Sequence, residues 1–324
     1  MKMEHMKNGK ALICGSIAYD SIMVFGDKFR NHILPDKIHI LNVSFFLPQM
    51  RREFGGCAGN IAYSLKLLGD AGVPMATVGK DFGVYAEWLK QTGVPADHVK
   101  VIDAEHTAQA FIITDQDDNQ ITAFHPGAMS LSHENKVTDA TGVTVGIVAP
   151  DGRDGMIQHA EQFAAAKIPF IFDPGQGLPM FGKEDLERFV SQATWVAVNE
   201  YEWQMLQQKT GWTLRDVVTQ VDALIVTLGS QGSTIHTRDD AITIPCATPK
   251  AVVDPTGCGD AYRAGILHGL LHGLDWKTTG QIASLLGAIK IETRGPQNHK
   301  FTRTEFAQRL EQSFGAGVAA KAAL

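Results

Sequence analysis

The chain has 324 residues, of which 44% are hydrophobic and 20% are charged, a composition typical of a soluble globular protein with a large core. Its formal net charge of −6 argues against nucleic acid or an anionic membrane surface as the main partner. No apolar run approaches the roughly 20 residues of a membrane span, and the scattered cysteines lack metal-binding or redox spacing, so a cytoplasmic location is expected.

Short apolar runs alternate with segments of helical period along most of the chain. Continuous apolarity favours strands covered on both faces, as in a parallel sheet. The candidate strands are residues 11–15, 75–79, 143–149, 169–173, 195–198 and 223–228. The candidate helices are residues 61–68, 84–92, 156–166, 183–192 and 200–209. This order predicts a three-layer α/β/α domain with a mostly parallel central sheet, followed by an all-helical segment from Asp260 to about Phe314.

Two stretches break this alternation. Residues 20–54 contain β-rich runs without a helical period, and residues 107–125 form two β-rich arms around the turn D-Q-D-D-N, which predicts a hairpin. We expect them to pair into a small β-sheet lid over a core made of residues 1–19, 55–106 and 126–324. An exposed edge of that sheet would suit a homodimer. The tail, residues 315–324, is expected to be a frayed helix or disordered.

A glycine-rich turn in the last third of the chain, V-D-P-T-G-C-G-D, carries two acids. Its simplest interpretation is a turn with an acid capping the next helix. The functional hypothesis is that Gly257, Cys258 and Gly259 present backbone N–H groups to a phosphoryl group at a helix N-terminus. Asp260 would then accept the proton of the attacking hydroxyl, with an ordinary pKa that leaves it ionised at neutral pH.

Two segments nearer the N-terminus allow both a structural and a chemical interpretation. The segment G-G-C-A-G-N suits tight helix packing with Asn60 as the N-cap, or the approach of a polyhydroxylated substrate to the backbone at Gly56. Asp20, just beyond the first predicted strand, is either an exposed loop acid or a bidentate ligand for a diol at the carboxyl edge of the sheet.

Two later segments are equally open. The segment N-E-Y-E has the spacing of a capping box, while Glu202 could also approach Mg²⁺ through ordered water. The segment T-L-G-S-Q-G reads as a hairpin turn, while Thr227 and its glycines at the end of a strand would suit nucleotide phosphates.

The chain has no P-loop, nucleophile elbow or zinc-protease motif, and no dinucleotide-binding motif after its first strand. The segments G-G-x-x-x-N, N-x-x-E, T-x-G-x-x-G and D-x-T-G-x-G-D, in this order, resemble the landmarks of the ribokinase-like (phosphofructokinase-B type) carbohydrate and nucleoside kinases. Further segments, among them G-S-I-A-x-D, Q-I-x-A-F-x-P-G-A-M and N-E-Y-E-W, are similar to bacterial adenosine kinases. The resemblance covers nearly the whole chain.

This resemblance implies phosphorylation of the 5′-hydroxyl of adenosine by ATP with Mg²⁺, giving AMP in purine salvage. The residues it implies for the ribose and the purine are Ser16, Asp20, Ser44, Gly56, Asn60, Phe124 and Gln176. The residues it implies for ATP are Asn199, Thr227, Gly229, Gly232 and Arg263. It implies Glu202 as a water-mediated Mg²⁺ ligand. It also implies a monovalent cation, such as K⁺, bound by Asp254, Thr256 and carbonyls around residues 288–295.

The chain departs from the family pattern at two positions. Cys258 stands where the family has alanine, glycine or another small residue, and Ala110 stands where a second aromatic ring would contact the base, unless Phe111 compensates. A sugar kinase of the same fold, acting on ribose or another furanose, is an alternative that Phe124 and Gln176 argue against. A non-catalytic nucleotide-binding protein is a second alternative, against which the intact acid and glycines of the turn argue.

Overall fold

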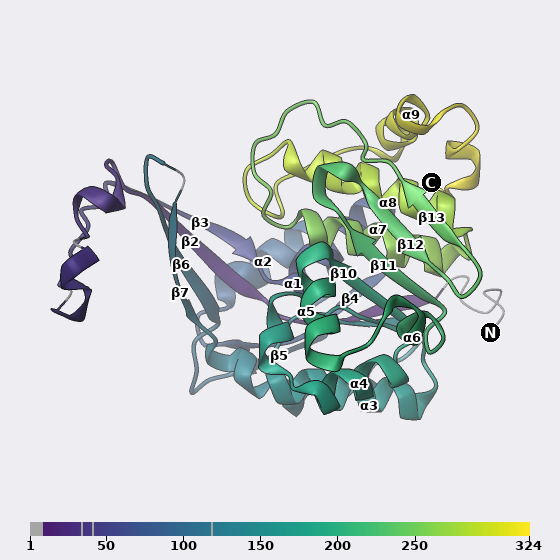
Figure 1. Ribbon diagram of the computed structural model, residues 1–324, viewed down its shortest axis with the longest axis horizontal. Helices are drawn as coiled ribbons and strands as arrows, with labels where there is room; N and C mark the ends of the chain where they lie inside the picture. The colour runs from purple at the N-terminus through teal and green to yellow at the C-terminus, as the bar shows by residue number, and fades with distance from the viewer. Residues whose placement is uncertain (1–8, 34, 41, 118) are drawn as a thin grey trace.

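Two β-sheets organise the chain (Figure 1). The computed structural model describes residues 9–33, 35–40, 42–117 and 119–324. Within these residues the larger sheet has nine strands in the order β13-β12-β11-β10-β9-β8-β1-β4-β5, and the smaller sheet has four in the order β3-β2-β6-β7. In the same ranges, no helix combines the length and apolarity needed to cross a membrane.

The larger sheet is parallel except at one edge. All neighbouring pairs from β5 to β11 run parallel, and β12 and β13 add antiparallel strands. The bounds are β1 Lys10–Cys14, β4 Gly72–Gly79, β5 His98–Ile102, β8 Val143–Val148, β9 Phe170–Phe172, β10 Trp195–Asn199, β11 Ala223–Thr227, β12 Ser233–His236 and β13 Ala241–Ile244. Parallel strands bring their carboxyl ends to one edge of the sheet, where ligands bind in such folds.

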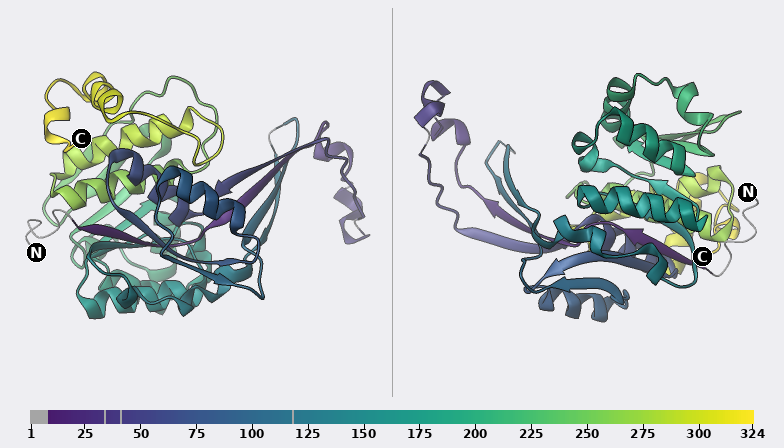
Figure 2. Two further views of the ribbon diagram at one scale, coloured as in Figure 1. Left: turned by 180° about the vertical axis from the view of Figure 1, so that it is seen from behind. Right: turned by 90° about the horizontal axis from the view of Figure 1, so that it is seen from below.

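Helices cover both faces of this sheet (Figure 2). One layer contains α1 (Cys57–Leu68), α2 (Gly83–Thr92), α7 (Cys258–His272), α8 (Trp276–Ile291) and α9 (Arg303–Phe314). The other contains α3 (Arg153–Ala166), α4 (Lys183–Gln192), α5 (Glu200–Thr210) and α6 (Leu214–Val218). Successive strand residues serve opposite layers: Leu12 packs with α3 to α6 and Ile13 with the other layer.

The predicted α/β/α architecture is confirmed, since every predicted strand and helix has a counterpart. Strand β5 was not predicted. Its sequence, H-V-K-V-I, alternates polar and apolar residues and remains partly exposed at the sheet edge, so it lacks the continuous apolarity on which the strand assignment relied.

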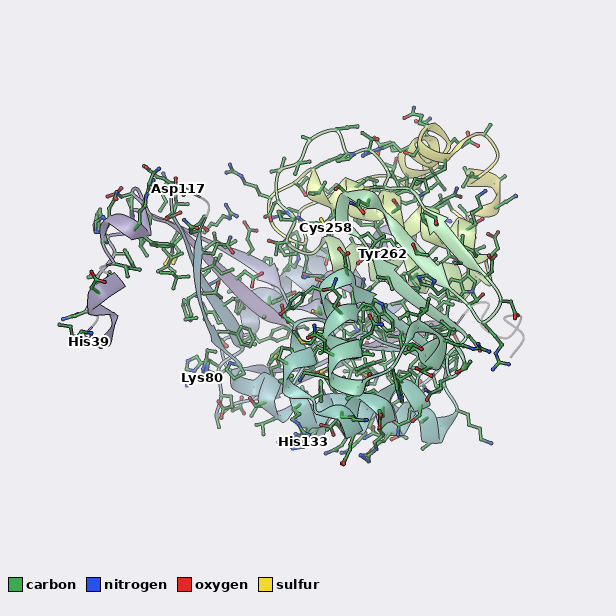
Figure 3. All side chains as sticks on the ribbon, viewed as in Figure 1. His39, Lys80, Asp117, His133, Cys258 and Tyr262 are labelled. Carbon is green, nitrogen blue, oxygen red and sulfur yellow. The ribbon has the colours of Figure 1, made fainter. Side chains whose placement is uncertain are left out.

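The smaller sheet is built from the two β-rich stretches. Its strands are β2 (Ala18–Val24), β3 (Gln49–Gly55), β6 (Ala108–Thr114) and β7 (Gln120–His125). The predicted hairpin is β6-β7, and β2 pairs parallel with β6 and antiparallel with β3. Between β2 and β3 the chain runs outward through η2 (Phe29–Asn31) and η3 (Pro35–Ile40). This extension points away from the core, with His39 at its far end and Asp117 near the tip of the hairpin (Figure 3).

The C-terminal tail packs against the core and is not frayed. Beyond α9 it forms the short helix η8 (Ala319–Lys321), and Ala322 is fully buried. The carbonyl oxygen of Ala322 lies 2.7 Å from Nε2 of His268, whose Nδ1 lies 2.6 Å from the Asp70 carboxylate. Nε2 of His272 is 2.8 Å from the same carboxylate. These polar contacts explain the order of a tail whose composition, rich in Ala and Gly, gives no such signal.

Candidate active site

The carboxyl ends of the parallel strands border a cavity of about 520 Å³, a volume typical of small-molecule sites. Ser16 follows β1, Pro150 follows β8 and Gln176 follows β9, and all three line this cavity. Residues of the smaller, four-stranded sheet, called the lid sheet from here on, line it as well. The predicted residues that line this cavity are Ser16, Asp20, Gly56, Asn60, Phe124, Gln176, Thr256, Gly257 and Asp260. Residues drawn from the whole length of the chain therefore meet in one place.

Helix α1 begins closer to the β1–β2 connection than a side chain would allow. Its N-cap is Gly56, with φ of 86°, and a Cβ there would lie 2.6 Å from both the Ser16 carbonyl oxygen and the Ala18 nitrogen. Only glycine combines this left-handed conformation with such close contact. Asn60 therefore sits in the first turn and is not the N-cap, so its amide is free to contact other side chains.

A chain of side-chain hydrogen bonds positions Asp260. Its Oδ2 accepts from Nδ2 of Asn60 at 2.7 Å, and Oδ1 of Asn60 accepts from Nε2 of Gln297 at 2.9 Å. Gln297 in turn accepts from Nε1 of Trp88 at 2.9 Å and lies 2.5 Å from the hydroxyl of Tyr85. Because both ends of the Asn60 amide are used, its orientation is fixed, with the donor end toward the carboxylate.

The pKa of the Asp260 carboxyl group is raised toward neutrality. Burial raises its pKa from 3.8 to about 6, the hydrogen bond from Asn60 lowers it, and the Asp173 carboxylate raises it. The expected ordinary pKa therefore does not hold, because the carboxyl group is partly buried at the wall of the cavity, where the charged form is less well solvated. A pKa close to the working pH is what a general base needs.

The loop ahead of α7 turns at Gly257, the N-cap of that helix, which has φ of 81°. A Cβ at Gly257 would lie 2.9 Å from Cβ of Pro296. The N–H of Cys258 donates to the Pro255 carbonyl at 3.1 Å, so Gly257 and Gly259 are the better candidates for holding a phosphoryl oxygen. Burial raises the pKa of the Cys258 thiol to about 11, which keeps it protonated and weakly nucleophilic.

One row of paired residues across the lid sheet brings several side chains to the cavity. In register, Glu53 pairs with Asp20, Asp20 with Ala110, and Ala110 with Phe124. Side chains of one rung point to the same face of a sheet, and Asp20, Ala110 and Phe124 all line the cavity. Burial raises the pKa of Asp20 to about 6, and the carboxylates of Glu53 and Asp254 raise it as well.

Ser44 is not brought to this cavity. It is exposed and lies between η3 and β3. The chain there runs along the extension that projects beyond the lid sheet (Figure 1), instead of folding back over the substrate site. Its predicted contact with the ribose has no support in this arrangement.

Apolar side chains from the lid and the neighbouring loops form much of the remaining wall. They are Ile112, Phe124, Met129 and Met180. Phe124 is 48% exposed, which leaves an aromatic face open for stacking. Phe111 does not line the cavity, since successive side chains of a strand alternate between faces. Phe111 therefore does not compensate for the small side chain of Ala110, and the aliphatic Ile112 lines the cavity instead.

A second cavity of about 210 Å³ adjoins the first. The residues that line both are Cys57, Pro150, Gln176, Gly257 and Asp260. Among the residues predicted to bind ATP, Mg²⁺ or the phosphoryl group, those that line the second cavity but not the first are Asn199, Glu202, Thr227, Gly259 and Arg263. Asp260 and Gly257 thus stand at the junction of two cavities, which is where a group would pass between two bound substrates.

The Asn199–Glu202 pair forms the capping box of α5. The Asn199 N–H and Nδ2 donate to the Glu202 carboxylate at 2.8 Å each, and the Glu202 N–H donates to Oδ1 of Asn199 at 2.8 Å. Burial raises the pKa of Glu202, and the nearby Asp173 carboxylate also raises it. The structural interpretation of this segment therefore holds, and it also places two oxygen-bearing side chains at the wall of the second cavity.

Arg263 is a buried, paired residue and not a surface arginine. Its Nε and Nη2 donate to Oδ2 and Oδ1 of Asp173 at 3.1 and 3.0 Å, and both side chains are almost fully buried. Such bidentate pairs are geometrically specific. Arg263 lines the second cavity. A phosphate bound there would have to share the guanidinium group with the Asp173 carboxylate or displace that carboxylate.

The last residue of β11 contributes a side chain to this cavity, but the turn that follows does not. Thr227 lines it, whereas Gly229 and Gly232 do not. The Leu228 N–H donates to the Gly232 carbonyl at 2.8 Å, and Gly232 has φ of 91°. The hairpin interpretation of these glycines is therefore sufficient to explain their positions.

Residues 20–303 match the profile of the pfkB family of carbohydrate kinases. The chain belongs to this family. The kinase is 33% identical to a nucleoside kinase of Methanocaldococcus jannaschii over 273 residues, which are 84% of this chain and 90% of the relative. The structure of a Burkholderia thailandensis nucleoside kinase with inosine is similar at a TM-score of 0.87 and 50% identity, covering 94% of this chain and 98% of that one. A Thermotoga maritima ribokinase, 20% identical with a TM-score of 0.76, shares the fold.

The kinase is thus a phosphotransferase with a ribokinase-like fold. The predicted family is confirmed. Its relatives in these comparisons are nucleoside kinases and sugar kinases, so they do not single out adenosine as the substrate.

Several site residues of the kinase were missed from the sequence. Met129 and Met180 lie in the short 3₁₀ helices η4 (Gly127–Glu134) and η6 (Gly175–Met180), where no sequence periodicity marks a wall residue. Gln297 lies in the loop after α8, and the only available signal was a polar run, P-Q-N-H. Asp151, in the loop between β8 and α3, also lines the large cavity. Burial raises its pKa to about 8, so it is mainly neutral at pH 7 and able to donate a hydrogen bond.

Proposed function

We propose that the kinase transfers the γ-phosphoryl group of ATP to the 5′-hydroxyl of purine nucleosides, adenosine and inosine among them. The product would be the nucleoside monophosphate, AMP in the case of adenosine, which is a reaction of purine salvage. The observation that carries this proposal is that one cavity joins polar groups suited to a ribose, Asp20 and Asn60, to an apolar wall containing Phe124. A free sugar is small and presents mainly hydroxyl groups to that wall, whereas a purine has a large, flat apolar face.

The relatives support the nucleoside as substrate. The Burkholderia thailandensis protein, at least 50% identical, is described as a nucleoside kinase and was solved with inosine and with ADP and inosine. Gln176 lines both cavities, and its amide can donate to or accept from the polar edge of either an adenine or a hypoxanthine. This supports acceptance of more than one purine.

In the proposed reaction Asp20 binds the 2′- and 3′-hydroxyls and places the 5′-hydroxyl beside Asp260. The ionised carboxylate of Asp260 accepts the hydroxyl proton as the oxygen attacks the γ-phosphorus, and the bond to the β-phosphate oxygen breaks. The N–H groups of Gly257 and Gly259, at the N-terminus of α7, stabilise the charge on the transferring phosphoryl oxygens. Asn60 keeps the carboxylate of Asp260 aimed at the hydroxyl.

The donor ATP would occupy the second cavity with its phosphates toward Gly257. Asn199 and Glu202 at its wall suit Mg²⁺ held through water, because Mg²⁺ keeps most of its water ligands. When bound, Mg²⁺ neutralises part of the phosphate charge. Closure of the lid sheet would bring Phe124 over the base and exclude water, which limits wasteful hydrolysis of ATP.

The test is ADP release by the purified kinase with adenosine, inosine, guanosine, ribose and fructose, followed by localisation of the phosphate with ³¹P and ¹H NMR. We expect the purine nucleosides to give the highest kcat/KM and a 5′-phosphate product. A higher kcat/KM for ribose or fructose than for every nucleoside would replace this proposal with the sugar-kinase alternative. Absence of ADP formation with every acceptor would favour a nucleotide-binding protein.

A further inference from the structure

Lys290 is a buried cation beside the loop that precedes α7. It is the next-to-last residue of α8 and is 0% exposed. Its Nζ donates to the carbonyl oxygen of Asp254 at 2.8 Å and to that of Thr293 at 3.2 Å. Burying an ammonium group is costly unless its donors are satisfied, so two carbonyl oxygens aimed at Nζ mark this as a built cation site.

The contacts around Lys290 join the anion-binding loop to the end of α8. The N–H of Asp254 donates to the Ile291 carbonyl at 3.1 Å. The two carboxylate oxygens of Asp254 accept from the N–H groups of Thr256 and Gly295 at 2.9 Å each. Lys290 therefore holds the backbone of Asp254, and the Asp254 side chain holds the next turn of the loop, directly ahead of Gly257.

The electrostatic surroundings of Lys290 are acidic. Burial lowers its pKa, while Asp254, the Cys258 thiol, Glu53 and Asp260 favour the charged form. The guanidinium of Arg51, with Nη2 3.9 Å from Oδ2 of Asp254, adds a second, more exposed positive charge. The ammonium group is thus the buried positive charge behind the loop that would receive the phosphoryl group.

An ammonium group and a potassium ion are similar in size, and carbonyl oxygens are the protein ligands that K⁺ prefers. The sequence analysis expected a monovalent cation to be held by Asp254, Thr256 and carbonyls around residues 288–295. Two carbonyls of that set, those of Asp254 and Thr293, accept hydrogen bonds from Lys290. The side chain therefore uses ligands that a free cation would need.

We propose that Lys290 is a positioning residue that replaces a monovalent cation: its ammonium group fixes the Asp254 carbonyl and, through it, the loop from which Gly257 and Gly259 bind the phosphoryl group. The inference rests on the proposed phosphoryl transfer at this loop. It follows that the kinase needs no added K⁺, and that removing the Lys290 side chain creates a site which a small monovalent cation fills.

The first experiment uses the unaltered kinase and compares kcat in buffers whose only monovalent cation is tetramethylammonium, Na⁺ or K⁺ at matched ionic strength. We expect the same kcat within about twofold. Activation by K⁺ of about tenfold or more would overturn the inference while leaving the kinase assignment intact. Failure to phosphorylate any acceptor in any salt would instead refute the proposed function.

The second experiment uses Lys290→Ala, with Lys277→Ala as the matched control on the exposed side of the same helix. We expect Lys290→Ala in tetramethylammonium to lose kcat by about tenfold or more, with little change in KM for the nucleoside. K⁺ or NH₄⁺ should restore kcat in a saturable way, and neither should affect Lys277→Ala. A Lys290→Ala kinase with full activity, or one folded but not restored by any cation, would contradict the proposal. If the variant does not fold, the first experiment decides alone.

Discussion

Asn60 and Asp260 are 200 residues apart in the sequence, and their side chains are joined by a 2.7 Å hydrogen bond. Each lies in the first turn of its helix, α1 for Asn60 and α7 for Asp260. The two helix N-termini therefore converge on the candidate base, with the amide donating to the carboxylate. The donor both orients the carboxylate and lowers its pKa, against the effect of burial.

Replacement of Asp260 by asparagine should abolish general-base catalysis while preserving shape. We expect Asp260→Asn to lower kcat by about 10²- to 10⁴-fold, because the amide cannot accept the hydroxyl proton. Steady-state ADP release measures the effect, and circular dichroism checks the fold. Asp239→Asn, in the exposed turn between β12 and β13, serves as the control. Turnover close to normal in Asp260→Asn would remove Asp260 as the base.

The pH dependence of turnover should report the raised pKa of Asp260. In the proposed reaction its deprotonated form is the active one, so kcat should fall as pH decreases through about 6. The measurement uses saturating nucleoside, because the pKa of Asp20 is also about 6 and affects binding. Asn60→Ala removes a contact that lowers the pKa of Asp260, so its acid limb should move to higher pH. An acid limb at the ordinary aspartate pKa of about 4 would contradict this prediction.

Stacking of the base should depend on one of two neighbouring lid aromatics. We expect Phe124→Ala to raise KM for adenosine or inosine by up to about tenfold, with a smaller effect on ribose. Phe111→Ala is a matched control, because Phe111 is similarly exposed at 41% but does not line the cavity. KM values for each substrate and variant measure the contrast. Equal effects of the two substitutions would argue against stacking at Phe124.

Replacing only one partner of the buried Arg263–Asp173 ion pair should lower the stability of the folded protein. Arg263→Met leaves the Asp173 carboxylate buried without its partner, so we expect a loss of about 3–5 kcal/mol in the free energy of unfolding. The double variant Arg263→Met with Asp173→Asn should recover most of it. Urea denaturation followed by circular dichroism measures both. A double variant no more stable than the single one would show that the unpaired charge is not the cause.

The anchor of the C-terminal tail should weaken in acid. Burial raises the pKa of Asp70, but hydrogen bonds from His268 and His272 lower it more, so the net shift is downward. A lowered folded-state pKa stabilises the protein above the unfolded pKa of about 4, and this contribution disappears as pH falls through the folded pKa. Asp70→Asn should therefore lower Tm at pH 7, with the gap to the unaltered kinase narrowing below about pH 4.

The control for that comparison is Asp97→Asn, at an exposed position. It should leave Tm unchanged across the same pH range. A Tm gap between Asp70→Asn and the unaltered kinase that stays constant down to strongly acidic pH would mean that the ionised carboxylate is not what stabilises the anchor.

The layers of the fold could be predicted because buried parallel strands are marked by continuous apolar runs. Many residues that line the cavity could be predicted from short motifs. These motifs contain Gly56 and Gly257, which have positive φ and pack closely against neighbouring segments. What could not be predicted was how charges pair. Arg263 with Asp173, and Lys290 with two carbonyls, are contacts between segments far apart in sequence, and no local pattern specifies them.

The same limit applies to electrostatics and to loops. The pKa of Asp260 depends on how deeply it is buried and on Asn60 and Asp173, none of which a motif encodes. Ser44 was implied by the family resemblance alone, and it is exposed and does not line the cavity. The wall residues Met129 and Met180 lie in short 3₁₀ helices whose sequences show no clear periodicity.

The register of the lid sheet has a consequence for how substrates are told apart. Asp20 and Phe124 are separated by two strand spacings through Ala110, or about 9–10 Å between their backbones. Hydrogen-bonded strands cannot slide without breaking their ladder, so this separation is a constant of the lid and does not adapt to the ligand. With the proposed roles of Asp20 and Phe124, discrimination by length follows: a molecule that reaches only one of the two positions gives up the contacts at the other, however well it fits there.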